Sequence, residues 1–326
     1  MKKLILLPVA LTLMVAQANG TIDSLINSGK SINKAKILYD SGKYELAATE
    51  LSRIDPRDTN YLYAMSEKAS ALLEIPRYQE AIDICTQALK RRSGYRASFY
   101  HSMAYAYSRI GKTEQALSTL KEGLAEFPFS YFLQYRYGTI LYHDSKFDEA
   151  ERWFFKILES TPYHSSSHLY LSKIAMRRGN KIEGMLSMGL YLTLKNSDNT
   201  QLQVLENFVK NELTDEGEIP KAETANPFSR ADEIIRSKIS FDDEFKIKIP
   251  IDVGIVRQYQ VLFELLETQS FVGDSPWIKY YIKIYKELIR ANAQEAFIYH
   301  ILQSGPIESA QQWKKKNDKS MQQFYT

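Results

Sequence analysis

The chain has 326 residues, of which 44% are hydrophobic and 25% are charged, so its composition is that of a folded protein and excludes intrinsic disorder. This length exceeds what one compact core usually holds, and we therefore expect two parts or an elongated array. With 14 glycines and 10 prolines the chain has few of the residues that form tight turns, which favours helices over an all-β fold.

The first eighteen residues have the layout of a secretory signal peptide. Lys2 and Lys3 precede an apolar run from Leu4 to Val15, and residues 16–18 (Ala-Gln-Ala) form a small-x-small cleavage site. The apolar run is too short to span a bilayer, which takes about 20 residues. We therefore predict cleavage after Ala18 and a mature chain that is periplasmic or secreted and has no transmembrane span.

The net charge and the cysteine content argue against several kinds of partner and of chemistry. Without Lys2 and Lys3 the formal net charge falls from +3 to +1, which gives no reason to expect nucleic acid or an anionic membrane as a partner. The basic run at 312–319 lacks the interleaved aromatic residues of a nucleic-acid site, so we expect a solvated helix face. Cys85 is the single cysteine, and we expect it to be a buried, inert thiol rather than a nucleophile.

A small residue recurs every 34 or 35 positions in the first two thirds of the chain. A larger apolar residue follows each one after four positions, so the two series form one stripe of a helix. Another helical pattern precedes each stripe, and each repeat is therefore expected to be a pair of helices. The small series is Ala47, Ala81, Ala116, Ala150 and Gly184, and the larger series is Leu51, Cys85, Leu120, Phe154 and Met188.

The residues between and after the helices complete the repeat. Gly42, Gly111 and Gly179 are expected in the left-handed conformation that ends a first helix, and Pro128 and Pro162 are expected to end second helices. This pattern resembles the tetratricopeptide repeat (TPR) family, whose unit is a helix-turn-helix of 34 residues. The resemblance covers roughly residues 28–196 and implies an all-α solenoid of about five units.

The rest of the chain does not follow this period. We predict an array over 19–213 whose last helix, 200–213, covers its exposed end, then a loop or linker over 214–230, then a mainly helical region over 231–326. The last region should contain a short strand at 245–249 and helices at 253–268, 276–291, 293–303 and 308–325. Both a separate domain and an extension of the solenoid fit this pattern.

The helix predicted at 276–291 carries one broad apolar face. Trp277, Tyr280, Tyr281, Ile284 and Leu288 share this face, and we expect it to pack against the array.

In the TPR family the first helices of successive pairs line a concave groove, so the resemblance also nominates binding residues. They occupy the second, fifth, ninth, twelfth and thirteenth positions of units that start at residues 28, 62, 97, 131 and 165. The set is aromatic and mildly basic, which suits a peptide-like or acidic ligand, although tyrosines can also simply cap exposed helix faces. The nominated residues are Lys36, Tyr39, Tyr63, His101, Tyr105, Arg109, Phe132, Tyr135, Tyr142, His143, Lys173 and Arg177.

Signals for catalysis or metal binding are weak. His164 and His168 stand at i and i+4, a spacing that can share a metal, but a site needs a third ligand and the sequence offers none nearby. We interpret them as polar residues at a helix N-terminus. The sequence has no glycine-rich phosphate loop, G-x-S-x-G elbow or C-x-x-C pair, so we expect neither an enzyme nor a cofactor or metal.

Two functions remain open at this point. The first is a non-enzymatic scaffold of the bacterial cell envelope that binds a peptide or protein partner in the groove. The alternative is a structural subunit of a larger envelope assembly that packs through its convex face and its C-terminal region. The signal peptide, the repeats and the aromatic helical tail together resemble exported TPR proteins of Gram-negative bacteria of the Bacteroidota type, which implies a periplasmic location.

Overall fold

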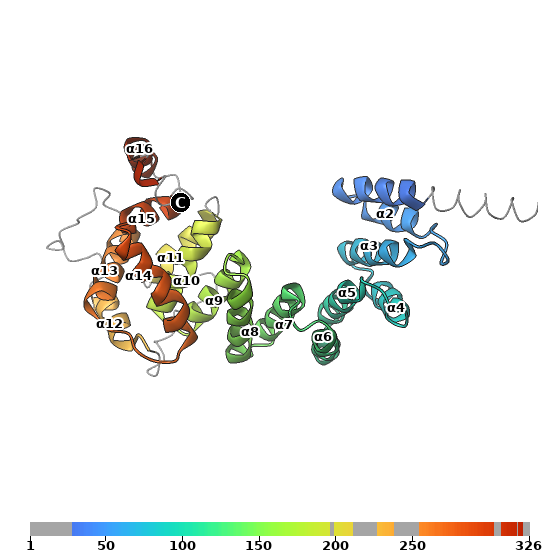
Figure 1. Cartoon of the computed structure of the whole chain (residues 1–326), viewed down its shortest axis with the longest axis horizontal. Coiled ribbons are helices and arrows are strands. Elements are labelled where there is room, and N and C mark those ends of the chain that lie inside the picture. Colours follow the sequence, from blue (N-terminus) through green and yellow to red (C-terminus); the bar gives the residue numbers. More distant parts are fainter. Residues whose placement is uncertain are drawn as a thin grey trace, which may run out of the picture. The chain divides into compact units, whose positions relative to one another are not determined.

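The computed structural model describes residues 28–195, 199–210, 227–237, 254–302, 308–317 and 319–321. Every regular element within these ranges is a helix (Figure 1), as predicted. They form two compact units that divide between Lys146 and Phe147. The predicted signal peptide and the predicted strand at 245–249 lie outside the described residues, as does most of the predicted loop at 214–230. None of the described helices is both long and apolar enough to cross a membrane.

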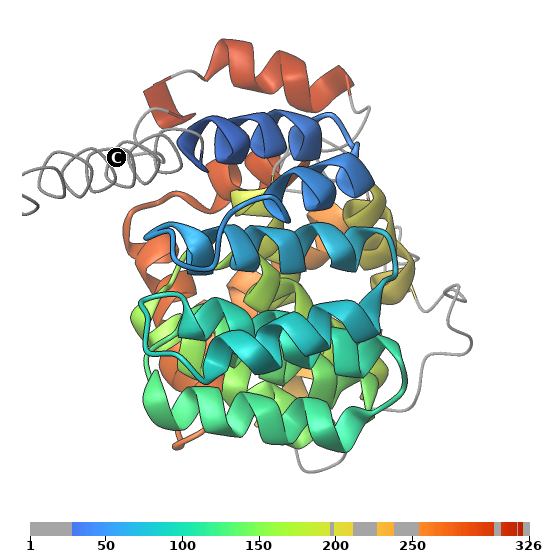
Figure 2. The ribbon, with the colours of Figure 1, turned by 90° about the vertical axis from the view of Figure 1, so that its right-hand side faces the viewer.

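The first unit consists of helices that follow one another in antiparallel pairs and stack in rows (Figure 2). Its first described helix covers residues 28–40. The helices that follow are α2 (Tyr44–Leu51), α3 (Tyr61–Glu74), α4 (Tyr78–Leu89), α5 (Arg96–Arg109), α6 (Thr113–Glu126) and α7 (Tyr131–His143).

The turns inside the repeats have the predicted left-handed backbone. Gly42 has φ 74°, Gly111 φ 76° and Gly179, in the second unit, φ 72°. Glycine takes this conformation without a steric penalty, which lets the chain reverse directly after a helix. Ser145 fills the equivalent position of the fourth repeat with φ 58°, so the turn geometry is kept where the sequence lacks glycine.

The core of the first unit contains the apolar residues that the repeat pattern predicts on one face of each second helix. Ala47, Ala81 and Ala116 are buried where neighbouring helices approach, and Leu51 and Leu120 fill the space beside them. Because small and large side chains alternate along each second helix, neighbouring helices can approach closely and interlock. The repeat of 34 or 35 residues in the sequence therefore marks the positions at which neighbouring helices pack against each other.

The second unit contains the last complete pair of repeat helices and the C-terminal helices. Its elements are α8 (Phe147–Ser160), α9 (Ser165–Arg177), α10 (Lys181–Leu194), α11 (Asn199–Lys210), α12 (Ser229–Ser237), α13 (Gly254–Thr268), a π-helical turn η1 (Ile278–Ile282), α14 (Lys283–Arg290), α15 (Gln294–Leu302) and α16 (Glu308–Lys316). The predictions for α11, α13, α14 and α15 are confirmed to within a few residues. The helix α16 ends at Lys316, earlier than predicted, where the Asn317 side-chain amide donates to the carbonyl of Trp313.

Helix α10 is buried on nearly every side. Its residues from Lys181 to Gly189 are all buried, and α9, α11, α12 and α15 all pack against it. A helix that is covered all round belongs to a core rather than to a surface. The C-terminal helices therefore enclose the last repeat and form one compact unit with it.

Three C-terminal helices converge on one turn of α10, at Gly189. The Tyr259 hydroxyl of α13 donates to the carbonyl of Met185 at 2.8 Å, and the Tyr285 hydroxyl of α14 donates to the carbonyl of Leu186 at 3.0 Å. A Cβ atom on Gly189 would lie 2.5 Å from the Tyr285 hydroxyl, 2.6 Å from the Tyr259 hydroxyl and 2.9 Å from the Phe297 ring of α15. The absence of a side chain at Gly189 is what lets the three rings reach the helix.

The predicted apolar face at 276–291 is partly wrong, and η1 is the reason. Trp277 and Tyr281 are buried as expected, and Ile282 is buried too, but on the following turn the buried residue is Tyr285, whereas Ile284 is only half-buried. A π-helical turn inserts one extra residue into the helix, so every later residue is rotated relative to an α-helical pattern. The shift brings the Tyr285 hydroxyl to α10, a contact that the sequence pattern had not suggested.

We expect Gly189→Ala to destabilise the second unit by about 1–3 kcal/mol, because the added Cβ displaces hydroxyls that are fixed by hydrogen bonds to α10. All three tryptophans of the chain, at 153, 277 and 313, lie in this unit, so urea unfolding followed by tryptophan fluorescence measures its stability directly. Gly94→Ala is the matched control, since a Cβ there meets no atom within 4 Å. An unchanged midpoint for Gly189→Ala would contradict this account of the packing.

Candidate partner-binding site

The nominated residues of the first two repeats meet around a small hollow. Lys36, Tyr39 and Tyr63 line it together with Glu67 of α3, and its volume of about 10 Å³ holds no more than one water molecule. Partial burial raises the pKa of the Glu67 carboxyl, and the charge of Lys36 opposes that shift. This hollow is too small to receive a side chain, so a partner would contact the residues on its rim.

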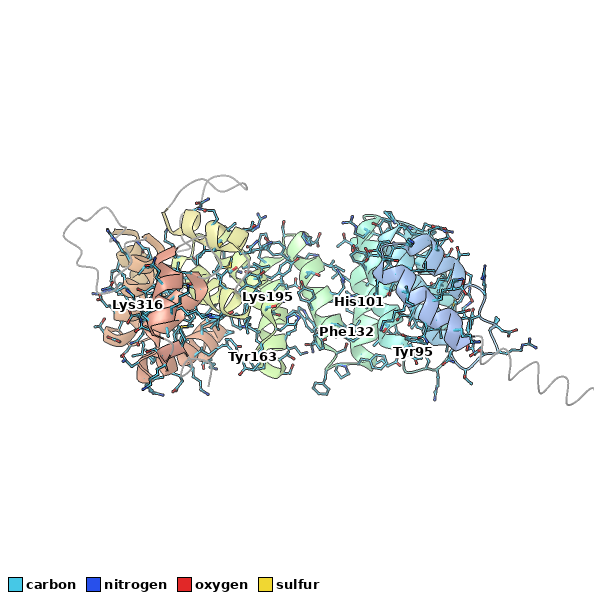
Figure 3. All side chains as sticks on the ribbon, turned by 90° about the horizontal axis from the view of Figure 1, so that it is seen from above. Tyr95, His101, Phe132, Tyr163, Lys195 and Lys316 are labelled. Carbon is cyan, nitrogen blue, oxygen red and sulfur yellow. The ribbon has the colours of Figure 1, made fainter. Side chains whose placement is uncertain are left out.

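Ring contacts bring nominated residues together with rings from other helices. The Tyr63 ring of α3 lies 5.4 Å from the ring of Tyr95, the residue before α5, and the His101 ring of α5 lies edge-on to the Phe132 ring of α7 at 5.7 Å (Figure 3). Tyr63, His101 and Phe132 are each half-buried. Aromatic side chains in this state have lost most of their conformational freedom and still offer contact area to a partner.

Two arginines share one tyrosine ring in the first unit. The Arg136 guanidinium of α7 lies 4.5 Å from the centre of the Tyr105 ring of α5, and the Arg109 guanidinium lies 6.0 Å from the same centre. Arg109 also donates from Nε to the Tyr78 hydroxyl at 3.2 Å, and Arg136 donates from Nε to His101 Nε2 at 3.2 Å. We call Tyr78, His101, Tyr105, Arg109 and Arg136 the arginine–tyrosine cluster.

The acceptor that holds Arg136 must be a neutral imidazole. An arginine can only donate, so His101 Nε2 accepts and carries no proton. Desolvation of the imidazole and the nearby Arg136 charge lower the pKa of His101 to about 3, well below its ordinary value. His101 therefore stays neutral across the physiological range, and its Nε2 remains an acceptor for Arg136.

The nominated residues further along the chain are placed differently. Tyr135 is half-buried and His143 is exposed, but Tyr142 is buried, which corrects the expectation that it faces the groove. Its ring packs edge-on against the His143 ring at 5.4 Å. Tyr142 therefore contributes to packing rather than to an accessible surface.

Lys173 and Arg177 belong to α9 and hence to the second unit. The Lys173 ammonium lies 5.7 Å from the Tyr170 ring, and the Arg177 guanidinium lies 5.6 Å from the Phe147 ring that begins α8. Both contacts lie within the second unit, whereas the other ten nominated residues belong to the first.

The sequence reasoning missed Arg136 and Tyr78. Arg136 occupies the sixth position of its repeat, which the family's set of groove positions leaves out. Tyr78 begins a second helix, whereas all the nominated residues lie on first helices. The sequence nevertheless contained a periodic signal for Tyr78, because an aromatic residue also begins α2 at Tyr44 and α8 at Phe147. The Phe147 ring contacts Arg177 in the same way as the Tyr78 ring contacts Arg109.

The histidine pair has structural roles, as interpreted from the sequence. His164 caps α9 by accepting the Ser167 backbone N–H on Nδ1 at 3.2 Å. His168 is buried, with Nε2 donating to the Pro162 carbonyl at 3.0 Å and Nδ1 accepting from the Tyr281 hydroxyl at 2.7 Å. Both ring nitrogens of His168 are thus occupied, and no group of three metal-ligating side chains gathers anywhere in the described ranges.

The cysteine and the basic run of the sequence also have structural explanations. Cys85 is fully buried in the core of the first unit, and burial raises the pKa of its thiol to about 12, so the predicted inert thiol is confirmed. In the basic run, Lys315 and Lys316 are exposed at the end of α16, while the Trp313 ring stacks on Tyr299 at 4.0 Å. Trp313 therefore anchors the helix whose lysines face solvent.

The buried neutral His168 makes the stability of the second unit depend on pH. Desolvation lowers its pKa to about 4, so between the ordinary value and about 4 the unfolded chain takes up a proton that the folded chain does not. This stabilisation is present at neutral pH and is lost as the pH falls through that window. From about pH 7.5 to about pH 5 we expect the wild type to lose roughly 2 kcal/mol more than His168→Gln in urea unfolding followed by tryptophan fluorescence. Equal losses in the two proteins would contradict the assignment.

Comparison with known proteins agrees with this architecture. Residues 32–96 and 101–165 match the tetratricopeptide repeat family. Among solved structures, the chain is similar to a thermophilic TPR protein of Thermus thermophilus, with 19% identity, a TM-score of 0.48, and coverage of 56% of this chain and 98% of that one.

A TPR protein from Parabacteroides merdae matches with 16% identity and a TM-score of 0.45 over 92% of this chain and 99% of that one. YrrB, described as a TPR protein with an unusual peptide-binding site, matches with 16% identity and a TM-score of 0.40 over 53% of this chain and 89% of that one. A search of curated proteins gave no significant match.

The two matched stretches coincide with the helix pairs and turns described above, so residues 32–96 and 101–165 are similar to tetratricopeptide repeats. Repeats of this family are generally non-catalytic scaffolds for protein–protein interaction.

Proposed function

We propose that the chain is a non-enzymatic scaffold that binds a peptide or protein partner on the surface formed by the first helices of its repeats. The observation that carries the proposal is the half-buried aromatic surface of α3, α5 and α7, where Tyr63, Tyr105 and Phe132 keep part of their rings accessible. Interfaces between proteins are enriched in such residues because a pre-ordered ring gives much contact for little loss of entropy.

The location of the scaffold is inferred from the first eighteen residues. Their basic start, apolar stretch and small-x-small site support export, so we propose that the protein works in the periplasm or as a secreted protein. The resemblance to exported TPR proteins of the Bacteroidota type stays a prediction. Membership of a larger envelope complex is compatible with the same location.

A capture experiment tests the binding surface. We expect the tagged mature chain to retain a partner from an envelope extract, and the variant Tyr63→Ala with Tyr135→Ala to retain at least about tenfold less, because truncating an aromatic anchor commonly costs about 2 kcal/mol. Quantitative mass spectrometry of the bound fraction measures the loss, and thermal unfolding followed by circular dichroism checks that the variant is folded.

The matched control removes two aromatic side chains from the loops between repeats. Phe129 is 89% exposed and Tyr163 is 82% exposed, so Phe129→Ala with Tyr163→Ala should leave the capture unchanged. If the loop variant loses the partner while the helix variant keeps it, the first-helix surface is not the binding surface. That result would instead favour the alternative, a structural subunit that packs through other surfaces of the array.

A further inference from the structure

One aromatic ring of the first unit stands in solvent at the tip of a tight turn. Phe129 is 89% exposed and lies in the loop that joins α6 to α7. The backbone N–H of Ser130 donates to the carbonyl of Phe127 at 3.1 Å, which closes a four-residue turn with Pro128 and Phe129 at its centre. The side-chain amide of Gln134 donates to the Pro128 carbonyl at 2.7 Å and fixes the turn on α7. The backbone therefore holds in water a ring that has no polar atom.

Two exposed tyrosines lie in and next to the same pair of loops. Tyr95 precedes α5 and Tyr131 begins α7, and both are exposed. The loop before α5 and the loop after α6 are neighbours, because the Arg96 guanidinium donates to the Glu126 carboxylate at 2.7 Å. This hydrogen bond lowers the pKa of Glu126, and the charge of Arg92 lowers it further. Rings and cations from the two loops therefore lie on one edge of the first unit.

The loop between α4 and α5 concentrates positive charge. Lys90, Arg91 and Arg92 are consecutive and exposed, and none of them forms an ion pair with any residue in the described ranges. The low net charge of the predicted mature chain gave no reason to expect an anionic membrane, but it says nothing of how charge is distributed. We call residues 90–95 and 127–131 the loop edge.

Exposed rings beside cations are the side chains that hold a protein at a bilayer surface. A ring without polar atoms gains free energy when it moves from water to the boundary between headgroups and acyl chains, and a protruding tip needs no complementary pocket there. Tyrosine suits the headgroup level, because its ring is apolar and its hydroxyl stays hydrated. Anionic headgroups attract nearby lysine and arginine, and this attraction adds to the insertion of the ring.

We propose that the loop edge docks the protein on an anionic phospholipid surface, with Phe129 inserted below the headgroups and the cations of residues 90–92 facing them. A nucleic acid duplex or an acidic polysaccharide matches the cations but leaves the Phe129 ring in water, whereas a lipid surface matches both. The inference concerns loops between repeats rather than the first-helix surface, so it does not rest on the proposed partner.

Flotation of the full mature chain with lipid vesicles tests the docking. One set of vesicles contains phosphatidylcholine alone, and the other also contains about 30% phosphatidylglycerol. In about 50 mM NaCl we expect half-maximal binding at an about tenfold or more lower lipid concentration for the phosphatidylglycerol vesicles. This preference should shrink in about 500 mM NaCl, because salt screens the charges. Absence of flotation with both sets would overturn the proposal.

The exposed ring is tested by Phe129→Gln. We expect this variant to bind the phosphatidylglycerol vesicles about tenfold or more weakly, because the apolar group that enters the lipid is lost. The matched control is Ile37→Gln, since Ile37 is 69% exposed but lies in the helix of residues 28–40, outside the loop edge. Circular dichroism checks that both variants are folded. Wild-type binding by folded Phe129→Gln would contradict the insertion of the ring and overturn the proposal.

The cations are tested by Lys90→Gln with Arg92→Gln, which should reduce the preference for phosphatidylglycerol about tenfold or more. Arg91 is left in place, because its guanidinium also donates to a backbone carbonyl of the preceding loop at 3.3 Å. The matched control is Lys43→Gln with Lys112→Gln. These two lysines are equally exposed but lie in the turns inside repeats, so the preference should persist. An equal preference in the two double variants would overturn the assignment of these cations to the lipid surface.

A polyanion without a bilayer provides the remaining comparison. Binding of a fluorescein-labelled DNA duplex or of labelled heparin is measured by fluorescence anisotropy. Tight binding to either one without flotation would identify a polyanion as the ligand of the loop edge and overturn lipid docking. Because the vesicles contain no protein, a failure of flotation leaves the proposed partner surface untouched, and a failure of the capture experiment leaves lipid docking untouched.

Discussion

The close approach of three aromatic rings to Gly189 is the constraint on which the second unit depends. A repeat array exposes an apolar face at its last unit, and that face must be covered. Here the hydroxyls of Tyr259 and Tyr285 bind carbonyls of α10, and the Phe297 ring packs beside them. All three contacts require the missing side chain at Gly189, and the contact of Tyr285 also follows the π-helical turn η1 in its helix. Local backbone features therefore help to decide how the C-terminal helices enclose the last repeat.

Tyrosine has two uses in this chain, and burial explains the difference between the examples below. In the second unit the hydroxyls of Tyr281 and Tyr285 are enclosed and bind His168 and a backbone carbonyl, because a buried polar group needs a partner. In the first unit Tyr63 and Tyr105 remain half-buried, with part of each ring accessible. The same residue type therefore holds the second unit together and offers a contact surface in the first.

Two arginines of the arginine–tyrosine cluster meet at one ring. Arg109 donates from Nε to the Tyr78 hydroxyl, Arg136 donates from Nε to His101 Nε2, and both guanidinium groups lie against the Tyr105 ring. Side chains from α4, α5 and α7 are thereby held together at one place in the first unit.

The sequence by itself determined the period, the helix pairs, the left-handed glycines and the buried Cys85, because repeat packing depends on residue size at fixed spacing. It also indicated an aromatic, basic surface on the first helices. Tertiary structure alone decided that Tyr285 rather than Ile284 meets α10, that Tyr142 is buried, and that Arg136 joins Arg109 at one ring. These outcomes depend on the backbone register and on contacts between residues far apart in the chain. The spacing of residues along the sequence reveals neither of these.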